Sequence, residues 1–435
     1  MAEYFYKAGA AKTVVPTPED LFPYHSWGPR RLTGTHDDLL VRAIYVKSPG
    51  ELLMVSVENG DIDPNWPNAL SELVHVPVKN IMISVTHTHT APYIGGYWPE
   101  NVDDVEKSQR YASLVWETLT QTVKEAMCKT YPVTLQFGYG SCNVNVNRDL
   151  PYIDAQTGKK KYKKTANIHG YSDKTVEVMR FVRQDGTTLG LLFNYSVHSS
   201  MLFGTHLKDD GQLVSGDLAG YAMKRVEKEL GEEAVAMFTM APAADSDPRY
   251  NTAWVEFDKE AGRMCWRDYG EGSFAVVDAL ASELAGEVLL VCSQMKDEAC
   301  EEIRSAEKTI MVPGKRKNDP KRDEENGVKK QMSEGFEPAE DVPIPLSVVS
   351  LGKLVLVGIG CETSSQNTPA IRNIIRNKGY ERSIIVTQCN GSSSYMSDEE
   401  GYEFNKFSAM ASHMMPEAIA CMYDGIEMLA GEIEG

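Results

Sequence analysis

The sequence predicts an α/β (α+β) protein in which mixed β-sheets are flanked by helices within a single large domain. Two observations predict this fold class. Short apolar runs rich in β-branched residues interleave with longer segments of helical periodicity, the order expected of mixed sheets covered by helices. The chain also has 435 residues, 42% of them hydrophobic, which is enough to build a large core.

The strand predictions rest on apolar runs that are short and bounded by Gly, Pro or Asn. Such runs are typical of strands rather than of amphipathic helices, because they lack a polar face at helical spacing. They cover residues 39–46, 52–57, 80–89, 175–182, 189–198, 234–240, 346–360 and 383–389.

Helical periodicity is clearest over residues 108–129, 218–231, 273–295 and 403–431. Asp217 stands directly before the second of these segments. An aspartate there can act as an N-cap, because its carboxylate accepts hydrogen bonds from amides that the first helical turn leaves free.

One segment, residues 313–342, interrupts this pattern of elements. It is charged, contains Pro and Gly, and has few apolar residues, so it predicts a long exposed loop. Strand-like sequence resumes directly after it, which favours an insertion over a linker between domains. We therefore expect residues 1–435 to form one domain that carries this insertion.

The chain is strongly acidic, with 44 Lys and Arg against 62 Asp and Glu and a net charge of -18. We expect no basic stripe to offset this charge. Nucleic acids and anionic membranes are therefore disfavoured as partners, since contacts to phosphate dominate such binding.

Targeting signals and cysteine usage indicate a cytoplasmic protein. The chain contains no run of roughly 20 apolar residues, and its first residues contain no apolar run of signal-peptide length. The eight cysteines are scattered, without CxxC pairs. We expect no transmembrane segment, no export and reduced thiols.

The motif THTHTAP (residues 86–92) is the best single signal of a chemical site. In an extended segment His87 and His89 project to the same face, at the end of an apolar strand. Two imidazoles so placed suit a metal site in which one binds the ion and the other handles protons. The alternative is two exposed histidines at a strand end.

Three further candidates, His198, Glu362 and Tyr395, also lie just past apolar runs. Because binding crevices form at the carboxyl ends of strands in α/β sheets, we expect them to converge. A His/His/Glu set is a familiar catalytic zinc arrangement that leaves a position for water. The alternative for Glu362 is a solvated carboxylate, and spacing alone does not show that Tyr395 is a ligand.

Other polar residues are candidates for contact with a substrate. Arg148 can anchor a carbonyl or carboxylate through its planar guanidinium, or pair with the aspartate beside it. Asp217 can bind substrate or only cap a helix. Asp245, Ser246 and Asp247 form a Pro-bounded loop that suits hydrogen bonding to a substrate and suits a plain turn equally.

Taken in order, these segments resemble the N-terminal catalytic domain of the neutral/alkaline non-lysosomal ceramidases, a family of zinc-dependent amidohydrolases. The resemblance covers about nine tenths of the chain. It runs through KAGAAKTVVPTPED, VTHTHTAP, NVNRD, NYSVHSSM, VSGDLAGYA, APAADSDP, CETSSQNTPAIR and SYMSDEEGY.

The resemblance implies a Zn²⁺ ion and assigns residues to it. It implies that the metal ligands are His87, His198, Glu362 and Tyr395, and that His89 and Arg148 lie beside the metal near the scissile amide.

The chain also departs from the family pattern. The family's GDVSPN loop corresponds to ADSDPR (residues 244–249), so Asp247 takes the serine position with Ser246 beside it. A second tyrosine of the family falls near Phe407. The immunoglobulin-like C-terminal domain and the secretion signal of larger members have no counterpart, which implies a short, unexported member of bacterial type.

The sequence thus predicts hydrolysis of an N-acyl amide by metal-activated water, with His89 moving the proton. The substrate is N-acylsphingosine or a more soluble N-acyl amide, because we expect no membrane-docking patch on so acidic a chain. One alternative is an ester or phosphoester hydrolase with a second metal at Asp217 or Asp245. Another is a non-catalytic binder of small molecules. The oligomeric state stays open.

Overall fold

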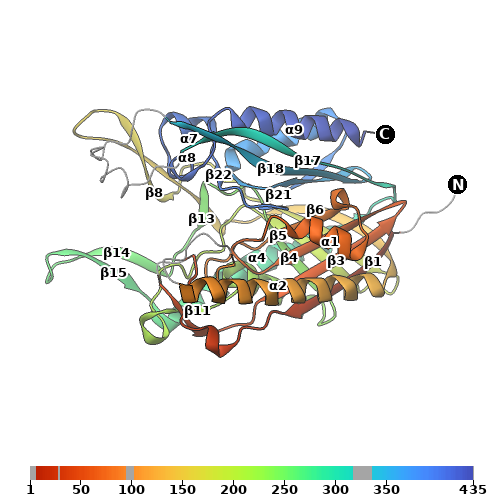
Figure 1. The fold of residues 1–435 in the computed structure, drawn as a ribbon, viewed down its shortest axis with the longest axis horizontal. Coiled ribbons are helices and arrows are strands. Elements are labelled where there is room, and N and C mark those ends of the chain that lie inside the picture. Colours follow the sequence, from red (N-terminus) through yellow and green to blue (C-terminus); the bar gives the residue numbers. More distant parts are fainter. Residues whose placement is uncertain (1–5, 28–29, 95–101, 317–335, 435) are drawn as a thin grey trace.

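Two mixed β-sheets packed face to face form the centre of the protein (Figure 1). The structure is a computed structural model that describes residues 6–27, 30–94, 102–316 and 336–434. Residues 6–240, with a short strand at 296–297, build the larger sheet, and residues 303–387 build the smaller one.

The larger sheet contains both parallel and antiparallel pairs. Strands β4 and β5 are parallel, as are β10 and β12, whereas the other neighbours along the sheet are antiparallel. Its order is β12 (Val235–Met240), β10 (Thr188–Tyr195), β9 (Thr175–Arg183), β6 (Tyr131–Ser141), β1 (Tyr6–Val14), β3 (Leu40–Ser48), β4 (Gly50–Val57) and β5 (Ile81–Val85), with β16 (Lys296–Asp297) added beside β6.

The smaller sheet has four strands and is also mixed, since β19 and β21 are parallel. Its order is β17 (Ile303–Lys315), β18 (Pro338–Leu351), β19 (Leu354–Ile359) and β21 (Arg382–Thr387).

Alternation along each strand explains why the central runs are apolar throughout. Along β4, Leu53 and Val55 pack toward helix α2 (Val102–Cys128), whereas Leu52 and Met54 pack toward the smaller sheet. Because successive side chains point to opposite faces, a strand buried on both faces needs apolar residues at every position.

Helices cover the outer faces of both sheets and give four layers. On the larger sheet lie α1 (Trp66–Val74), α2, α3 (Asp217–Leu230) and α4 (Ser273–Gln294). On the smaller sheet lie α6 (Thr368–Asn377) and α9 (Ala418–Glu432), the latter at the top of Figure 1. The predicted class of mixed sheets flanked by helices is therefore confirmed.

Short sheets and helices fill the edges. The short strands are β2 (Leu32–Thr35) with β11 (Gln212–Val214), β7 (Asn145–Ile153) with β8 (Lys160–Asn167) and β13 (Ser246–Pro248), β14 (Ala253–Asp258) with β15 (Arg263–Asp268), and β20 (Glu362–Thr363) with β22 (Tyr395–Met396). The short helices are α7 (Glu399–Glu403), α8 (Phe407–Ala411) and the 3₁₀ turns Glu19–Leu21, Val78–Asn80, Lys208–Asp210, Gly270–Gly272 and Ser365–Asn367.

Two of the predicted elements are wrong in extent. The helix expected over residues 403–431 is broken into the end of α7, α8 and α9, because Asn405 is left-handed and Pro416 cannot continue a helix. The run expected over 346–360 forms β18 and β19, which turn at Gly352 with a φ of 64°.

The loop expected over residues 313–342 is shorter than predicted. Strand β17 continues to Lys315 and β18 begins at Pro338, so the two strands extend into the charged segment from both sides. The remaining residues of the prediction, 317–335, lie outside the described residues. Among the described helices, none is long and apolar enough to cross a membrane.

A buried charge cluster joins β3 and β4 to α3 and supports the loop that follows β4. Arg42 is fully buried, donates from Nε to Glu227 Oε1 at 2.7 Å and pairs through Nη1 with Glu58. Lys12 reaches Glu227 at 3.1 Å. Glu58 directly precedes Asn59, and a Cβ at Gly216 would lie 2.4 Å from its Oε2, so the start of α3 packs closely on this carboxylate.

We predict that Arg42→Met destabilises the protein by about 3–5 kcal/mol, because it leaves Glu58 buried without its cation and Glu227 with Lys12 alone. Urea denaturation measures the loss. The matched control is Arg225→Met, since Arg225 pairs with Asp278 near the surface and such pairs contribute about 0–1 kcal/mol. Equal losses in the two variants would contradict this account of the cluster.

Candidate active site

The predicted site residues converge where the two sheets meet. His87 follows β5 and His198 follows β10 of the larger sheet, whereas Glu362 follows β19 and Tyr395 follows β21 of the smaller one. Strand β20 pairs with β22 so that Glu362 lies opposite Tyr395. The four positions therefore share one end of both sheets, as the rule for the carboxyl ends of strands predicts.

Three histidines form the centre of the site. The ring centroids of His87, His89 and His198 lie 4.9 to 5.8 Å apart. One ring nitrogen from each lies within 4.8 Å of the others, close enough to bind one metal ion. The described residues contain one such group of His, Cys, Asp or Glu side chains, and it is this one.

His87 reaches this position by a route that the sequence interpretation did not foresee. Strand β5 ends at Val85, and His87 has a left-handed φ of 56°. Strand alternation is therefore not what brings His87 and His89 together. A sharp bend after the strand does so, held by hydrogen bonds from Thr88 and Thr90 hydroxyls to the carbonyl of Ser215.

Glu362 links two of the histidines. Its Oε2 lies 3.0 Å from His198 Nε2, and its Oε1 lies 3.3 Å from His87 Nε2. Gln388 donates from Nε2 to Oε1 at 3.0 Å. The carboxylate is 5% exposed, so nearly all of its interactions are with the protein.

Backbone carbonyls orient both imidazoles. His87 Nδ1 donates to Gly60 O at 2.8 Å, and His198 Nδ1 donates to Ser246 O at 2.9 Å. A carbonyl only accepts, so each Nδ1 carries a proton, and each Nε2 presents a lone pair toward Glu362 unless a second proton is bound. A carbonyl behind each imidazole is typical of metal-binding histidines.

These donors fit a metal cation. Two imidazole nitrogens that face a carboxylate at 3.0 and 3.3 Å need a positive charge among them. Burial alone would raise the pKa of Glu362. The interactions with His87 and His198 lower it by more, so that it lies well below its ordinary value. Two imidazoles with one carboxylate form a common donor set for zinc.

His89 differs from the other two histidines. Neither of its ring nitrogens hydrogen-bonds to any residue that the structure describes, although both are buried. Burial lowers its pKa well below the ordinary value, and His87 and His198 lower it further. Its ring meets Phe203 edge to face at 5.6 Å. His89 is therefore a neutral imidazole whose nitrogens are available to a reactant.

Tyr395 and Arg148 form one wall of the site. The Tyr395 ring lies 6.5 Å from that of His198, at an interplanar angle of 29°, and the Arg148 guanidinium lies 5.5 Å from the Tyr395 centroid. Burial and Glu362 raise the pKa of Tyr395, whereas Arg148 lowers it. The structure places Tyr395 beside the histidines, and its role as a ligand stays a prediction.

Arg148 is 2% exposed and does not pair with its neighbour in sequence. It donates from Nη1 to Asp247 Oδ1 at 2.9 Å and from Nη2 to Ala244 O at 2.6 Å. Asp247 thus neutralises a buried guanidinium. Burial alone would raise the pKa of Asp247, but Arg148 lowers it below its ordinary value.

The remaining candidates hold the loops around the site. Asp245 accepts from the backbone nitrogen and hydroxyl of Ser365 at 2.7 and 2.8 Å. Asp217, with a φ of 50°, accepts from the amides of Met201, Leu202 and Leu218. The Ser246 hydroxyl is buried without a partner in the described chain. A substrate role for these residues stays a prediction.

Two residues of the site were missed from the sequence. Gln388 is the first residue after β21, so the rule that located Tyr395 also applies to it. Burial lowers the pKa of His87, but Glu362 and, to a smaller extent, Asp61 raise it above its ordinary value; burial raises the pKa of Asp61 itself to about 6. It follows β4, and the same rule applies there.

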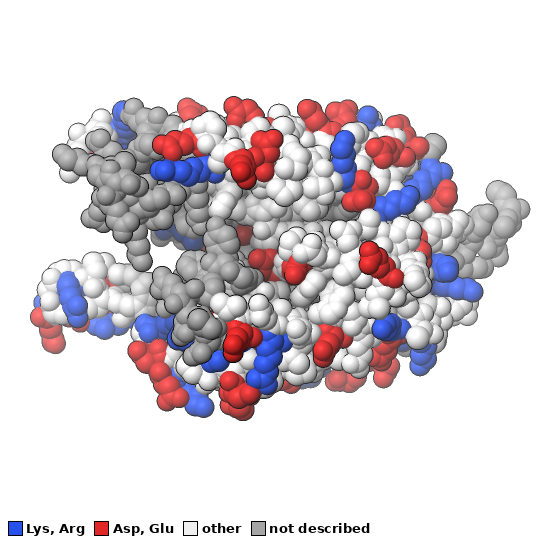
Figure 2. Space-filling view, viewed as in Figure 1, with Lys and Arg blue, Asp and Glu red and all other residues white. Residues whose placement is uncertain are grey.

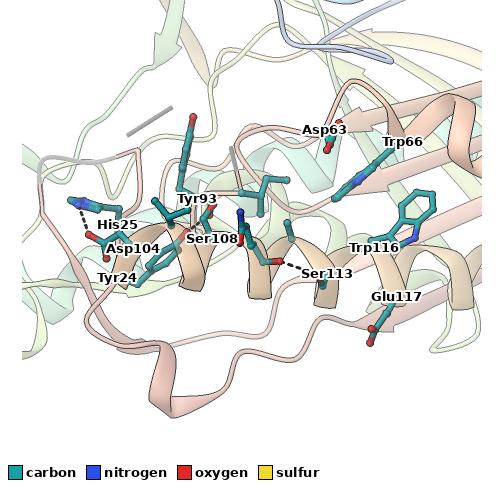
Figure 3. Close-up of a pocket in the computed structure, with 14 residues that line it drawn as sticks. Tyr24, His25, Asp63, Trp66, Tyr93, Asp104, Ser108, Ser113, Trp116 and Glu117 are labelled. Carbon is teal, nitrogen blue, oxygen red and sulfur yellow. Dashed lines mark hydrogen bonds and ion pairs between the residues drawn. The ribbon is translucent and has the colours of Figure 1, made fainter. Parts of the chain in front are cut away.

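A separate pocket of about 590 Å³ lies beside α2 (Figure 3). It is lined by aromatic side chains that include Tyr24, Trp66, Tyr93 and Trp116. None of the histidines of the site lines it, and Trp27 lies between, in contact with both Tyr93 and His87. The pocket is therefore distinct from the histidine cluster.

Fold and site together define an α/β scaffold with a buried imidazole and carboxylate centre. Residues 68–274 match the family described as neutral/alkaline non-lysosomal ceramidase, N-terminal. The resemblance noted from the motifs is confirmed.

Similar proteins agree with this assignment. A segment of 222 residues is 27% identical to the neutral ceramidase of Pseudomonas aeruginosa and covers 48% of this chain and 30% of that protein. A segment of 201 residues is 23% identical to neutral ceramidase B of Dictyostelium discoideum, covering 45% and 26%. The matched segments thus span less than a third of these relatives.

Solved structures share the fold over nearly the whole chain. The neutral ceramidase of Pseudomonas aeruginosa superposes with a TM-score of 0.73 at 17% identity, covering 98% of this chain and 74% of that one. A ceramidase complexed with C2 gives a TM-score of 0.74 at 16% identity, covering 98% and 75%.

We predict that Zn²⁺ raises the Tm of the metal-free protein and that His198→Gln removes this effect. At a free Zn²⁺ concentration 100 times Kd, the gain in stability is about 2.7 kcal/mol. Thermal melts measure it. His206→Gln is the control, because His206 pairs with Asp268 outside the cluster. An equal Zn²⁺ effect in both variants would place the metal elsewhere.

Proposed function

We propose that the protein is a zinc-dependent amidohydrolase that cleaves an N-acyl amide bond with water. One observation carries the proposal: Glu362 contacts both His87 and His198 in a buried centre, with an unpartnered neutral His89 beside it among the described residues. The match of residues 68–274 to the ceramidase family supports the amide as the bond cleaved.

The proposed ligands are His87, His198, Glu362 and Tyr395. Zinc held there would supply Lewis acidity, which polarises a carbonyl and lowers the pKa of a water molecule. The chain's contribution is to hold the donors without rearrangement. The carbonyls of Gly60 and Ser246 fix both imidazoles, and Gln388 fixes the carboxylate.

His89 is the proposed general base and acid. Its neutral imidazole takes a proton from the attacking water as the oxygen adds to the carbonyl carbon. It then gives that proton to the amine nitrogen as the C–N bond breaks, so the products are a carboxylic acid and an amine. Burial suits this role, because it holds the pKa of His89 below its ordinary value and keeps the ring neutral at pH 7.

Arg148 is the proposed source of positive charge beside the carbonyl oxygen. Its Nη1 and Nη2 already donate to Asp247 and Ala244, so it acts through its position and its field. Asp247 holds the guanidinium in place, at the sequence position where the family has a serine.

The substrate class follows from the family. N-acylsphingosine is the candidate that the names of the relatives indicate, and a more soluble N-acyl amide is the variant of the proposal. The phosphoesterase alternative needs carboxylates for a second metal, but those of Asp217 and Asp245 are engaged by backbone amides. We also infer a cytoplasmic location, which the eight free cysteines support.

We predict that His89→Gln lowers kcat on an N-acyl amide by about 10²- to 10⁴-fold while the zinc content stays at one per chain, because the variant loses proton transfer and keeps the proposed ligands. His87→Ala is expected to lose both zinc and activity. Hydrolysis of N-acyl amides of graded chain length, ceramides included, and elemental analysis measure these effects, with His206→Gln as the control.

The outcomes separate the alternatives. If the metal-replete wild type cleaves no amide, the amidohydrolase proposal fails and the binder remains. Two metals per chain with phosphoester cleavage would favour the phosphoesterase. Cleavage of water-soluble amides alone would exclude N-acylsphingosine as the substrate.

A further inference from the structure

Two β-hairpins project from the same side of the molecule, at the left of Figure 1. One is the β14–β15 hairpin, residues 253–268, and the other is the β7–β8 hairpin, residues 145–167. Of the 20 large hydrophobic side chains that the described surface exposes, eight lie on these two hairpins.

The β14–β15 hairpin has one apolar and one charged face. Val255 pairs with Trp266, and Phe257 pairs with Met264, so these four side chains share a face. They are 42 to 60% exposed. The opposite face carries Arg267, which forms ion pairs with acidic residues of β14. Figure 2 shows uncharged side chains on this projection beside charged ones of both signs.

The apolar face continues to the histidines. Trp266 donates from Nε1 to the carbonyl of Gly204 at 2.9 Å. The preceding residue, Phe203, is 40% exposed and meets the His89 ring at 5.6 Å. The apolar face of the hairpin therefore reaches Gly204, and the residue before it contacts the proposed catalytic imidazole.

The β7–β8 hairpin combines exposed apolar residues with lysines. Leu150, Tyr152 and Ile153 are exposed on β7. Its lysines outnumber its two acidic residues, Asp149 and Asp154, and are Lys159, Lys160, Lys161, Lys163 and Lys164. The structure pairs Lys160 with Glu400 and Lys161 with Asp154, but gives Lys163 and Lys164 no ion pair within the described chain.

This second hairpin borders the other side of the site. Lys164 Nζ lies 4.1 Å from the centroid of Phe407. Phe407 is 37% exposed and packs against Tyr395, with ring centroids 5.8 Å apart. The β14–β15 hairpin thus joins the site at His89, and the β7–β8 hairpin joins it at Tyr395.

We propose that the β7–β8 and β14–β15 hairpins dock the protein on a lipid bilayer that contains anionic lipid, with the site mouth against the membrane. This inference rests on the proposed function and deepens it, because it makes the amide substrate a lipid that resides in the membrane.

The composition of the surface favours a bilayer over a protein partner. Tryptophan and tyrosine prefer the interface between hydrocarbon and water, and lysines extend their ammonium groups to lipid phosphates while their stems cover apolar surface. The net charge of -18 opposes anionic surfaces at long range, but screening confines that repulsion to about 8 Å at physiological ionic strength. Close to the membrane, the local lysines decide the interaction.

The proposal departs from two expectations from the sequence, the absence of a basic stripe and of a docking patch. Residues 253–268 conceal the patch because apolar and charged residues alternate along them, and only the hairpin gathers the apolar ones on one face. Acidic residues elsewhere in the chain outweigh the lysines of residues 159–164 in the net charge, but the hairpin itself has more basic than acidic residues.

Co-sedimentation with phosphatidylcholine vesicles that contain roughly 20% phosphatidylglycerol tests the proposal. We expect the wild type to sediment, and the double variant Phe257→Ser, Met264→Ser to bind at least about tenfold more weakly. The matched control is Tyr139→Ser, Met311→Ser, since both residues are exposed but lie outside the hairpins. We expect Lys163→Gln, Lys164→Gln to weaken binding mainly to the anionic vesicles.

A second measurement is the rate on a vesicle-embedded N-acyl amide divided by the rate on a water-soluble one. We expect this ratio to fall in the Phe257, Met264 variant and not in the control. If the wild type cleaves the soluble amide but does not sediment, docking is refuted and the proposed function stands. If it sediments but cleaves no amide, the proposed function fails and docking stands.

Light scattering distinguishes a second copy of the chain as the partner. A wild-type dimer that Phe257→Ser dissociates, together with no binding to vesicles, would overturn the proposal. A wild type that sediments with phosphatidylcholine alone as strongly as with the anionic vesicles would overturn the role of the lysines.

Discussion

The contact of Glu362 with His87 and His198 is the interaction on which the site depends. It joins the two sheets, because the histidines follow strands of the larger sheet and the carboxylate follows a strand of the smaller one. A carboxylate and two imidazoles are costly to bury unless their charges and hydrogen bonds are satisfied. The face-to-face packing of the sheets supplies the rigid apolar frame that makes this burial possible.

The backbone around this contact is held in conformations that most residues avoid. His87, Gln388 and Asp217 have φ values of 50 to 56°, although none is glycine. Each such residue costs of order 1–3 kcal/mol and persists only where its surroundings determine it. Here Gly60 holds the His87 ring, and Asp217 accepts three backbone amides. These left-handed residues turn the chain sharply, so the side chains of the site lie close to the ends of their strands.

Much of this centre could be predicted from the sequence because it obeys a local rule. His87, His198, Glu362 and Tyr395 each follow an apolar run, and runs that form neighbouring strands bring their ends together. The rule does not predict contacts between residues that are distant in the sequence. Nothing near Arg148 in the sequence indicates Asp247, which lies 99 residues away.

Elements exposed on one face were the hardest to predict. Strands β7, β8, β14 and β15 were missed because charged residues interrupt their apolar positions, whereas the buried strands show continuous apolar runs. Helix α9 was located but extended too far toward its N-terminus, since the periodicity of 403–431 continues across the breaks near Asn405 and Pro416.

The two departures from the family pattern change the same wall of the site. Asp247, in place of a serine, compensates the buried charge of Arg148. Phe407, near the position of a family tyrosine, offers an apolar ring to both Arg148, at 5.1 Å, and Lys164. Toward the site, this wall therefore presents Arg148 neutralised by Asp247. At its outer rim it presents the apolar ring of Phe407 and the ammonium group of Lys164. A rim of this kind favours contact with a lipid surface and disfavours a wide aqueous opening, so the departures belong with the hairpins rather than with a loss of catalysis.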